Sequence, residues 1–132
     1  MEGAKRILVV EDNPAMAKVI SFNLTAAGYD TVVASNGLLA WEILQQEHFD
    51  FLVTDYQMPQ MDGRTLVQNI RESSQHRRLP AIMLTAKELE LASAIASDEL
   101  QLVSMLQKPF SPSELTQRID SYFHRVCVLE NA

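Results

Sequence analysis

The feature that most constrains this chain is a set of four short apolar runs, each followed by a polar residue with reactive chemistry. Short apolar runs bounded by turn signals are typical of parallel strands that are buried on both faces. In open sheets of such strands, the ligand site lies just beyond the carboxyl ends of the strands. The runs are residues 7–10 before Glu11 and Asp12, 51–54 before Asp55, 81–84 before Thr85, and 103–107 before Lys108. The sequence therefore predicts that these polar groups meet in one crevice.

Strand-like runs alternate with helix-like stretches five times, which is typical of βα units that build a parallel sheet. A further strand is expected at residues 31–34. Helices are expected from Asn13-Pro14 to Gly28, over 36–44, 64–72 and 89–98, and from a capping box at residues 111–114. Phe22 on the first helix is expected to be a core or helix-packing residue. We expect one α/β domain over residues 1–132, with a core over about residues 5–127.

The composition limits the classes of function. The chain is 47% hydrophobic and 21% charged, as is usual for a soluble globular protein. Its formal net charge of -6 repels phosphate backbones, so we expect no direct binding of nucleic acid. No apolar run is long enough to span a bilayer or to form the core of a signal peptide, and the single Cys127 cannot form an internal disulfide. We therefore expect a cytoplasmic protein that does not bind membranes.

The polar residues at the strand ends suit phosphoryl transfer. Three carboxylates, those of Glu11, Asp12 and Asp55, would repel one another unless a cation lay between them, and hard oxygen ligands suit Mg²⁺ or Mn²⁺. A carboxylate can also act as a nucleophile, and Asp55 is the candidate to form an acyl phosphate. The metal ion, Lys108 and the Thr85 hydroxyl could each take one phosphoryl oxygen. Each residue alone could be an ordinary loop or capping residue, so the prediction depends on their common place at strand ends.

Four motifs carry a family resemblance. They are Ile7-Leu8-Val9-Val10-Glu11-Asp12-Asn13, the stretch 53–59 with Met61-Asp62-Gly63, Leu84-Thr85-Ala86, and Lys108-Pro109-Phe110. With these motifs the chain resembles the receiver domain of response regulators from bacterial two-component, or phosphorelay, systems along nearly its whole length. The resemblance implies a (βα)5 flavodoxin-like three-layer sandwich with a parallel five-stranded sheet of order 2-1-3-4-5.

The resemblance also implies a role for each site residue. Asp55 would accept a phosphoryl group from a phosphohistidine on a sensor histidine kinase or a histidine phosphotransfer protein. Mg²⁺ would be held by Asp12, Asp55 and the backbone carbonyl of Gln57, with Glu11 acting mainly through water. Lys108 would pair with the aspartate and then with the phosphoryl group, and Thr85 would bind a phosphoryl oxygen and shift on activation. The Lys108-Pro109 bond is expected to be cis.

The chain departs from the family pattern at positions that concern switching. Met105 stands where the family usually has an aromatic residue coupled to the threonine, so the usual switch is in question. Gln101 stands where a glycine is common, before the last strand. Gln57 and Lys87 flank the path of a hydrolytic water in the family, and our hypothesis is that their long side chains screen the acyl phosphate.

The sequence thus predicts a phosphoacceptor signalling domain that changes its surface to regulate a partner or an output domain. Its only catalysis would be phosphoryl uptake and autodephosphorylation on itself. The docking surface is expected on the fourth helix, the fifth strand and the fifth helix, with a phosphorylation-dependent homodimer as one option. The small residues of the fourth helix are explained equally well as packing spacers. One alternative is a degenerate receiver that acts as an interaction module without phosphorylation. A phosphatase with an aspartyl nucleophile is another, although such enzymes usually need a second acid where Gln57 stands.

Overall fold

The structure is a computed structural model, and it describes residues 3–86 and 100–130 of the chain. Five parallel strands form one sheet of order β2-β1-β3-β4-β5. The strands are β1 (Arg6–Val10), β2 (Asp30–Ala34), β3 (Phe51–Asp55), β4 (Ala81–Thr85) and β5 (Ser104–Gln107). The predicted strand order is confirmed.

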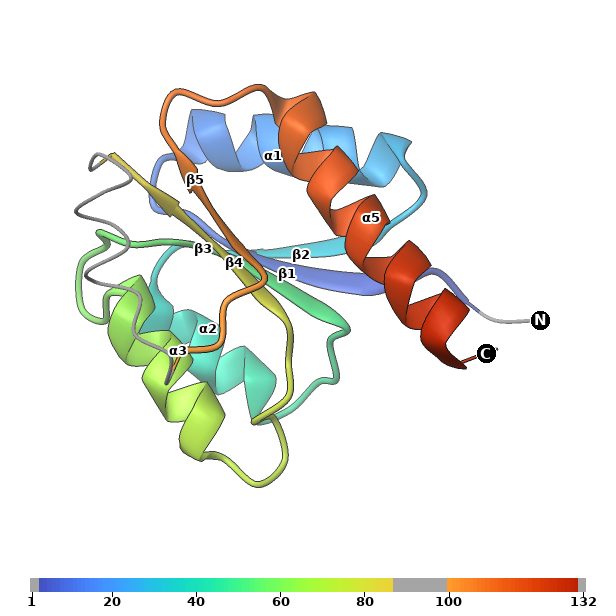
Figure 1. Ribbon diagram of the computed structural model, residues 1–132. Coiled ribbons are helices and arrows are strands. Elements are labelled where there is room, and N and C mark those ends of the chain that lie inside the picture. The colour runs from blue at the N-terminus through green and yellow to red at the C-terminus, as the bar shows by residue number, and fades with distance from the viewer. Residues whose placement is uncertain (1–2, 87–99, 131–132) are drawn as a thin grey trace.

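Helices cover both faces of the sheet, as Figure 1 shows. On one face lie α1 (Pro14–Ala26) and α5 (Pro112–Glu130), and on the other lie α2 (Gly37–Leu44) and α3 (Gly63–Glu72). The architecture is therefore the three-layer α/β sandwich that the sequence predicts. The helix expected over residues 89–98 lies outside the described residues. Within 3–86 and 100–130, no helix is both long and apolar enough to cross a membrane.

The strand register aligns the carboxyl ends of the strands. Val10 of β1 pairs with Thr54 of β3, and Asp55 pairs with Leu84 of β4. All residues of β3 and β4 are buried, because these central strands have neighbours on both sides and helices over both faces. The residues that directly follow β1 and that end β3 and β4 therefore meet at one edge of the sheet.

Alternate side chains of the strands fill two separate cores. Leu8, Leu52 and Met83 pack toward α2 and α3, whereas Phe51 and Ile82 pack toward α1 and α5. Phe51 also makes edge-on ring contacts with Tyr122 and Phe123 of α5. Burial on both faces thus explains why the central strands are continuous apolar runs.

Phe22 does not pack in the core, contrary to the prediction from sequence. Its side chain is 73% exposed. Helix α1 buries Ala17, Ile20 and Leu24 against the sheet. Phe22 follows Ile20 by two positions, and at about 100° per residue it points away from that buried face.

Three helices, α1, α2 and α3, begin with a side-chain N-cap. The Oδ1 atoms of Asn13, Asn36 and Asp62 accept the backbone N–H groups of Met16, Leu39 and Thr65 at 3.1, 2.8 and 2.8 Å. Each such cap contributes about 1 kcal/mol and fixes where the loop ends. The first helix therefore begins as the sequence predicts.

The expected capping box at the start of α5 is replaced by other contacts. The Glu114 carboxylate accepts a hydrogen bond from Arg118 at 3.0 Å instead of reaching back toward Ser111. The Ser111 hydroxyl lies 2.7 Å from the hydroxyl of Ser113. Arg118 stands one turn after Glu114 and competes for its carboxylate. The capping-box pattern covers only residues 111–114, so it does not include this competing arginine.

The entry to β5 differs from ordinary extended backbone. Gln101 has a φ of 49°, in the left-handed region that glycine adopts most easily. The Arg71 side chain fixes the backbone nearby, because it donates hydrogen bonds to the carbonyls of Leu100 at 2.7 Å and Leu79 at 2.6 Å. The substitution of glutamine for the common glycine therefore falls at a position with positive φ.

Candidate functional site

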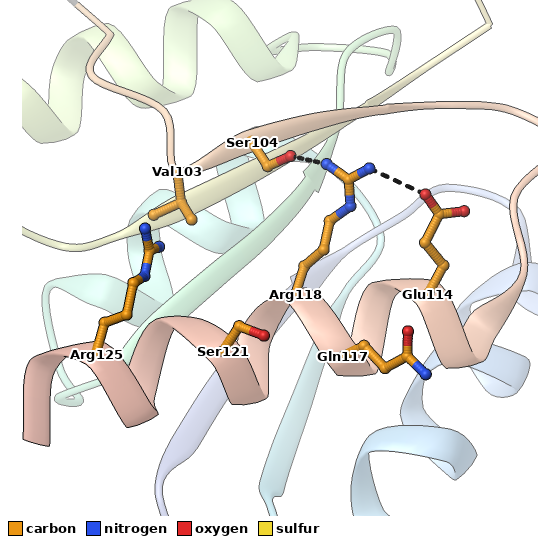
Figure 2. A pocket seen from close by; sticks show the side chains of 7 residues that line it. All are labelled: Val103, Ser104, Glu114, Gln117, Arg118, Ser121 and Arg125. Carbon is orange, nitrogen blue, oxygen red and sulfur yellow. Dashed lines mark hydrogen bonds and ion pairs between the residues drawn. The ribbon is translucent and has the colours of Figure 1, made fainter. Parts of the chain in front are cut away.

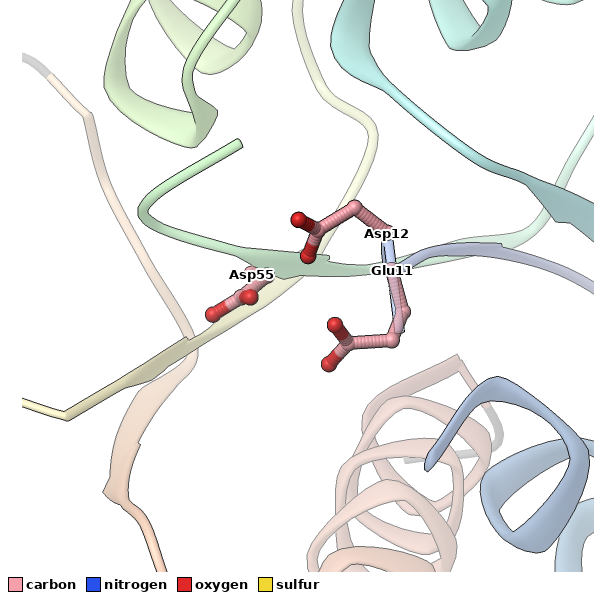
Figure 3. Close-up of side chains that lie close together, drawn as sticks. All are labelled: Glu11, Asp12 and Asp55. Carbon is pink, nitrogen blue, oxygen red and sulfur yellow. The ribbon is translucent and has the colours of Figure 1, made fainter. Parts of the chain in front are cut away.

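Three carboxylates meet at the carboxyl edge of the sheet. Glu11 and Asp12 follow β1 directly, and Asp55 is the last residue of β3. One oxygen from each carboxylate lies within 4.8 Å of the others (Figure 3). Glu11 and Asp55 are 2% and 6% exposed, whereas Asp12 is exposed to solvent. The cluster predicted from the strand ends is thus present in the fold.

The ammonium group of Lys108 lies between two of these acids. Its Nζ atom is 3.1 Å from Oε1 of Glu11 and 3.0 Å from Oδ2 of Asp55. Lys108 is placed by the end of β5, where its backbone N–H donates to the carbonyl of Thr85 at 2.7 Å. The peptide bond from Lys108 to Pro109 is cis, as predicted. Three carboxylates and one ammonium give the cluster a formal charge of -2, which favours a further cation.

Hydrogen bonds orient the carboxylate of Asp55. Its Oδ1 accepts the backbone N–H of Tyr56 at 3.0 Å, while its Oδ2 accepts from Lys108. The hydroxyl of Thr54 donates to the carbonyl oxygen of Asp55 at 3.0 Å and fixes the backbone at this point. Asp55 is therefore held in one orientation, as a positioned nucleophile must be.

The pKa values of Glu11 and Lys108 reflect their burial and contact. Burial raises the pKa of the Glu11 carboxyl, and the charge of Asp55 acts in the same direction, against hydrogen bonds from the Asn13 backbone and from Lys108. Burial alone would lower the pKa of Lys108, but its hydrogen bonds to Asp55 and Glu11 outweigh burial and raise it. The lysine therefore stays charged at neutral pH, and it can attract a phosphoryl group.

An open pocket of about 420 Å³ lies beside the cluster and gives access to it from solvent. Asp12 lines it on one side, and the loop after β3 lines it on the other. Within this loop, Tyr56 and Met58 pack against the core, whereas Gln57 is exposed. The pocket therefore exposes Asp12 and the loop that directly follows Asp55 to a ligand from solvent.

Comparison with known proteins identifies the family. The sequence model of the response regulator receiver domain matches residues 7–120. The chain belongs to this family. The receiver is 39% identical over 121 residues to the probable transcriptional regulator ycf27 of Cyanophora paradoxa, which covers 92% of the chain and 49% of the relative. The chain spans about half the length of such curated relatives.

Two further relatives match over most of their own length. The receiver is 34% identical to chemotaxis protein CheY-3 of Vibrio cholerae over 122 residues, or 92% of the chain and 93% of the relative. The solved receiver domain of a sensor histidine kinase from Pseudomonas aeruginosa, with a magnesium ion coordinated in its active site cleft, is 30% identical. The alignment covers 87% of this chain and 93% of that one, with a TM-score of 0.77. The chain is a response regulator receiver domain of two-component signalling.

The remaining predicted residues differ in their burial. Thr85 ends β4 and is 1% exposed, whereas Ala86 is exposed. Met105 lies in β5, pairs with Met83 of β4, and is partly buried against the core under α2 and α3. Lys87 lies outside the described residues.

From sequence, two glycines of the receiver were interpreted only as signals of a helix start and of a turn. A Cβ atom at Gly63 would lie 2.3 Å from the carbonyl oxygen of Asp55, and one at Gly37 would lie 2.3 Å from that of Met61. Their places at the ends of turns are visible in the sequence. The contacts that require glycine are visible only in the fold, because they join segments that are distant in the chain.

Proposed function

We propose that this receiver accepts a phosphoryl group on Asp55 from a phosphohistidine of a sensor histidine kinase or a histidine phosphotransfer protein. The observation that carries the proposal is the oriented Asp55 carboxylate, with Lys108 at 3.0 Å and two further acids beside it. A carboxylate oxygen of Asp55 attacks phosphorus as the bond from phosphorus to the imidazole nitrogen breaks, and the electron pair returns to the imidazole. Catalysis in such a transfer consists mainly of positioning and charge stabilisation.

The donor set fits a divalent metal ion. The acidic cluster offers hard carboxylate oxygens and carries a formal charge of -2 after the contribution of Lys108, which suits Mg²⁺, or Mn²⁺ in its place. Asp12, Asp55 and the backbone carbonyl of Gln57 would hold the ion, with Glu11 acting through water. When bound, the ion neutralises charge on the phosphoryl oxygens. The magnesium ion coordinated in the active site cleft of the Pseudomonas aeruginosa receiver supports this assignment.

Lys108 and Thr85 would stabilise the product. The raised pKa of Lys108 keeps its ammonium charged, so it can turn from the Asp55 carboxylate to a phosphoryl oxygen without leaving the site. The buried Thr85 at the end of β4 supplies a hydroxyl at the same edge of the sheet. The reaction ends with hydrolysis of the acyl phosphate on the same chain, so the protein is a self-modifying switch and no enzyme for a separate substrate.

The output would be a change at the surface formed by β5 and α5, and the helix over residues 89–98 that was also expected to dock a partner lies outside the described residues. A groove of about 590 Å³ lies between β5 and α5, with Ser104 on one wall and Arg118 on the other (Figure 2). Arg118 donates hydrogen bonds to the hydroxyl of Ser104 and to Glu114. Such polar grooves suit a protein partner, an attached output domain, or a second copy in a phosphorylation-dependent homodimer.

Two alternative functions, an interaction module and a phosphatase, differ from the proposed one in the chemistry at Asp55. A phosphorylation-independent interaction module is favoured by Met105, which has no ring to move between two positions. The intact acidic cluster speaks against that alternative. A phosphatase is disfavoured by Gln57, whose amide cannot act as a general acid where a second carboxyl group would be needed.

Incubation with acetyl phosphate and Mg²⁺ separates the three functions. We expect stable phosphorylation of the wild type, seen by intact mass, and its loss in Asp55→Asn and in excess chelator. Asp30→Asn is a matched control, because Asp30 is exposed at the start of the edge strand β2. Steady release of phosphate without a modified protein would identify a phosphatase, and no modification would identify the interaction module.

A further inference from the structure

The start of α2 touches the loop that follows Asp55, and the contact depends on a residue without a side chain. Gly37, the first residue of α2, is buried against Met61. A Cβ atom at position 37 would lie 2.3 Å from the carbonyl oxygen of Met61 and 2.9 Å from its Cβ atom. Both distances are shorter than the 3.0 Å below which real Cβ contacts essentially never fall. Only glycine allows the loop to lie this close to the helix.

Hydrogen bonds and core contacts hold the loop from Tyr56 to Gly63 together, so a displacement of Met61 is transmitted to the rest of the loop. The N–H of Gly63 donates to the carbonyl of Tyr56 at 2.8 Å, and the N–H of Met61 donates to the carbonyl of Pro59 at 2.8 Å. The side chains of Tyr56 and Met61 also pack against one hydrophobic core, and Asn69 of α3 contacts the Met61 sulfur at 3.8 Å. Displacement of Met61 therefore moves the loop as a unit.

We infer that Gly37 is a positioning residue for metal binding, which acts through this loop. The inference rests on the proposed function, in which the carbonyl of Gln57 is a metal ligand. A Cβ atom at Gly37 would push the Met61 carbonyl by at least about 0.7 Å, the difference between 2.3 and 3.0 Å. Metal coordination distances tolerate only about 0.2 Å. The space at Gly37 thus sets the distance from Gln57 to the carboxylates of Asp12 and Asp55.

For the substitution Gly37→Ala, helix propensity alone predicts no loss of stability or of metal binding. Alanine favours a helix more than glycine does, so an effect confined to α2 would leave the helix at least as stable. Gly37 also lies in a different element from each of the proposed ligands, so a local effect would leave metal binding unchanged. Metal affinity and helix stability therefore separate a positioning role from a local structural one.

Titration calorimetry with Mg²⁺ on the full chain tests the inference. We expect Gly37→Ala to bind Mg²⁺ about tenfold or more weakly than the wild type, as is usual when a supporting residue around a metal is altered. In phosphorylation by acetyl phosphate, the half-saturating Mg²⁺ concentration should rise by the same factor, with less change in the rate at saturating Mg²⁺. Leu38 is the next residue of α2 and is 42% exposed, so Leu38→Ala should bind Mg²⁺ as tightly as the wild type does.

Each outcome decides a separate point. Equal Mg²⁺ affinity in Gly37→Ala and the wild type would overturn the inference and leave the proposed function standing. Absence of Mg²⁺ binding by the wild type would overturn the proposed metal site, and the inference with it. If Gly37→Ala does not fold in chelator, Met61→Ala decides, because it loosens the loop from its other side. An unchanged affinity in Met61→Ala would then overturn the inference.

Discussion

The Nζ atom of Lys108 lies 3.0 Å from Oδ2 of Asp55, and the same ammonium group lies 3.1 Å from Oε1 of Glu11. One lysine thus holds together two buried acids that come from separate strands. Because Asp12 adds a third carboxylate and no second lysine or arginine among the described residues pairs with the cluster, the site is short of positive charge. The proposed metal ion and the phosphoryl chemistry both follow from this imbalance.

Replacement of Lys108 by methionine should destabilise the chain in the absence of metal. Glu11 and Asp55 would then face each other without a cation, and we expect the free energy of unfolding to fall by about 1–3 kcal/mol. Urea denaturation in chelator measures this change. Lys18→Met, on the exposed face of α1, is the matched control and should change stability little. An unfolding midpoint in Lys108→Met equal to that of the control would contradict the electrostatic account.

Replacement of Asp12 by asparagine should weaken metal binding without harming the fold. Asp12 is exposed, and its removal relieves repulsion within the cluster, so stability in chelator should stay equal or rise slightly. We expect Mg²⁺ affinity to fall at least about tenfold. Consequently, the rise in melting temperature that Mg²⁺ produces in the wild type should shrink. A variant that binds Mg²⁺ as tightly as the wild type would remove Asp12 from the metal site.

The lifetime of the phosphorylated state should depend on Gln57, which is exposed beside the pocket, and on Lys87. If their long side chains screen the acyl phosphate from water, alanine at either position should speed autodephosphorylation. We expect an increase on the order of threefold to tenfold, or at most about 1.4 kcal/mol of barrier. Loss of phosphate after removal of the donor measures the rate. Equal rates in both variants and the wild type would end this hypothesis.

Replacement of Gln101 by glycine should stabilise the chain. Its φ of 49° costs a non-glycine residue about 1–2 kcal/mol, whereas the greater freedom of glycine in the unfolded chain costs about 0.4–1 kcal/mol. The difference between these two costs gives an expected net gain of about 0–1.6 kcal/mol, measured by urea denaturation. Gln101→Ala, which keeps a Cβ atom, should show no such gain. A loss of stability in Gln101→Gly would mean that the glutamine side chain has a stabilising contact that outweighs the strain.

The sheet and most of the site could be predicted from sequence because their signals are local. Each central strand is a short apolar run, and burial on both faces requires that pattern. The reactive residues follow these runs directly, so the shared edge of a parallel sheet brings Glu11, Asp12 and Asp55 together. The resemblance to receivers then supplied the strand order, which no single strand encodes.

The errors concern contacts between elements. Phe22 was expected to be a core or helix-packing residue, but its position relative to Ile20 and Leu24 places it on the outer face of α1. Glu114 was expected to cap its own helix, but Arg118 binds it. Likewise, the need for glycine at position 37 comes from Met61, which a sequence pattern cannot place beside it.

The central claim is that Asp55 is the phosphoacceptor. Borohydride reduces an acyl phosphate to an alcohol, so treatment of the phosphorylated chain converts the modified aspartate to homoserine, which peptide mass spectrometry can locate. We predict homoserine at position 55 after incubation with acetyl phosphate and Mg²⁺, and none when Mg²⁺ is chelated. Homoserine at Asp12 or at another acid, or at no position while phosphate is still incorporated, would contradict the assignment.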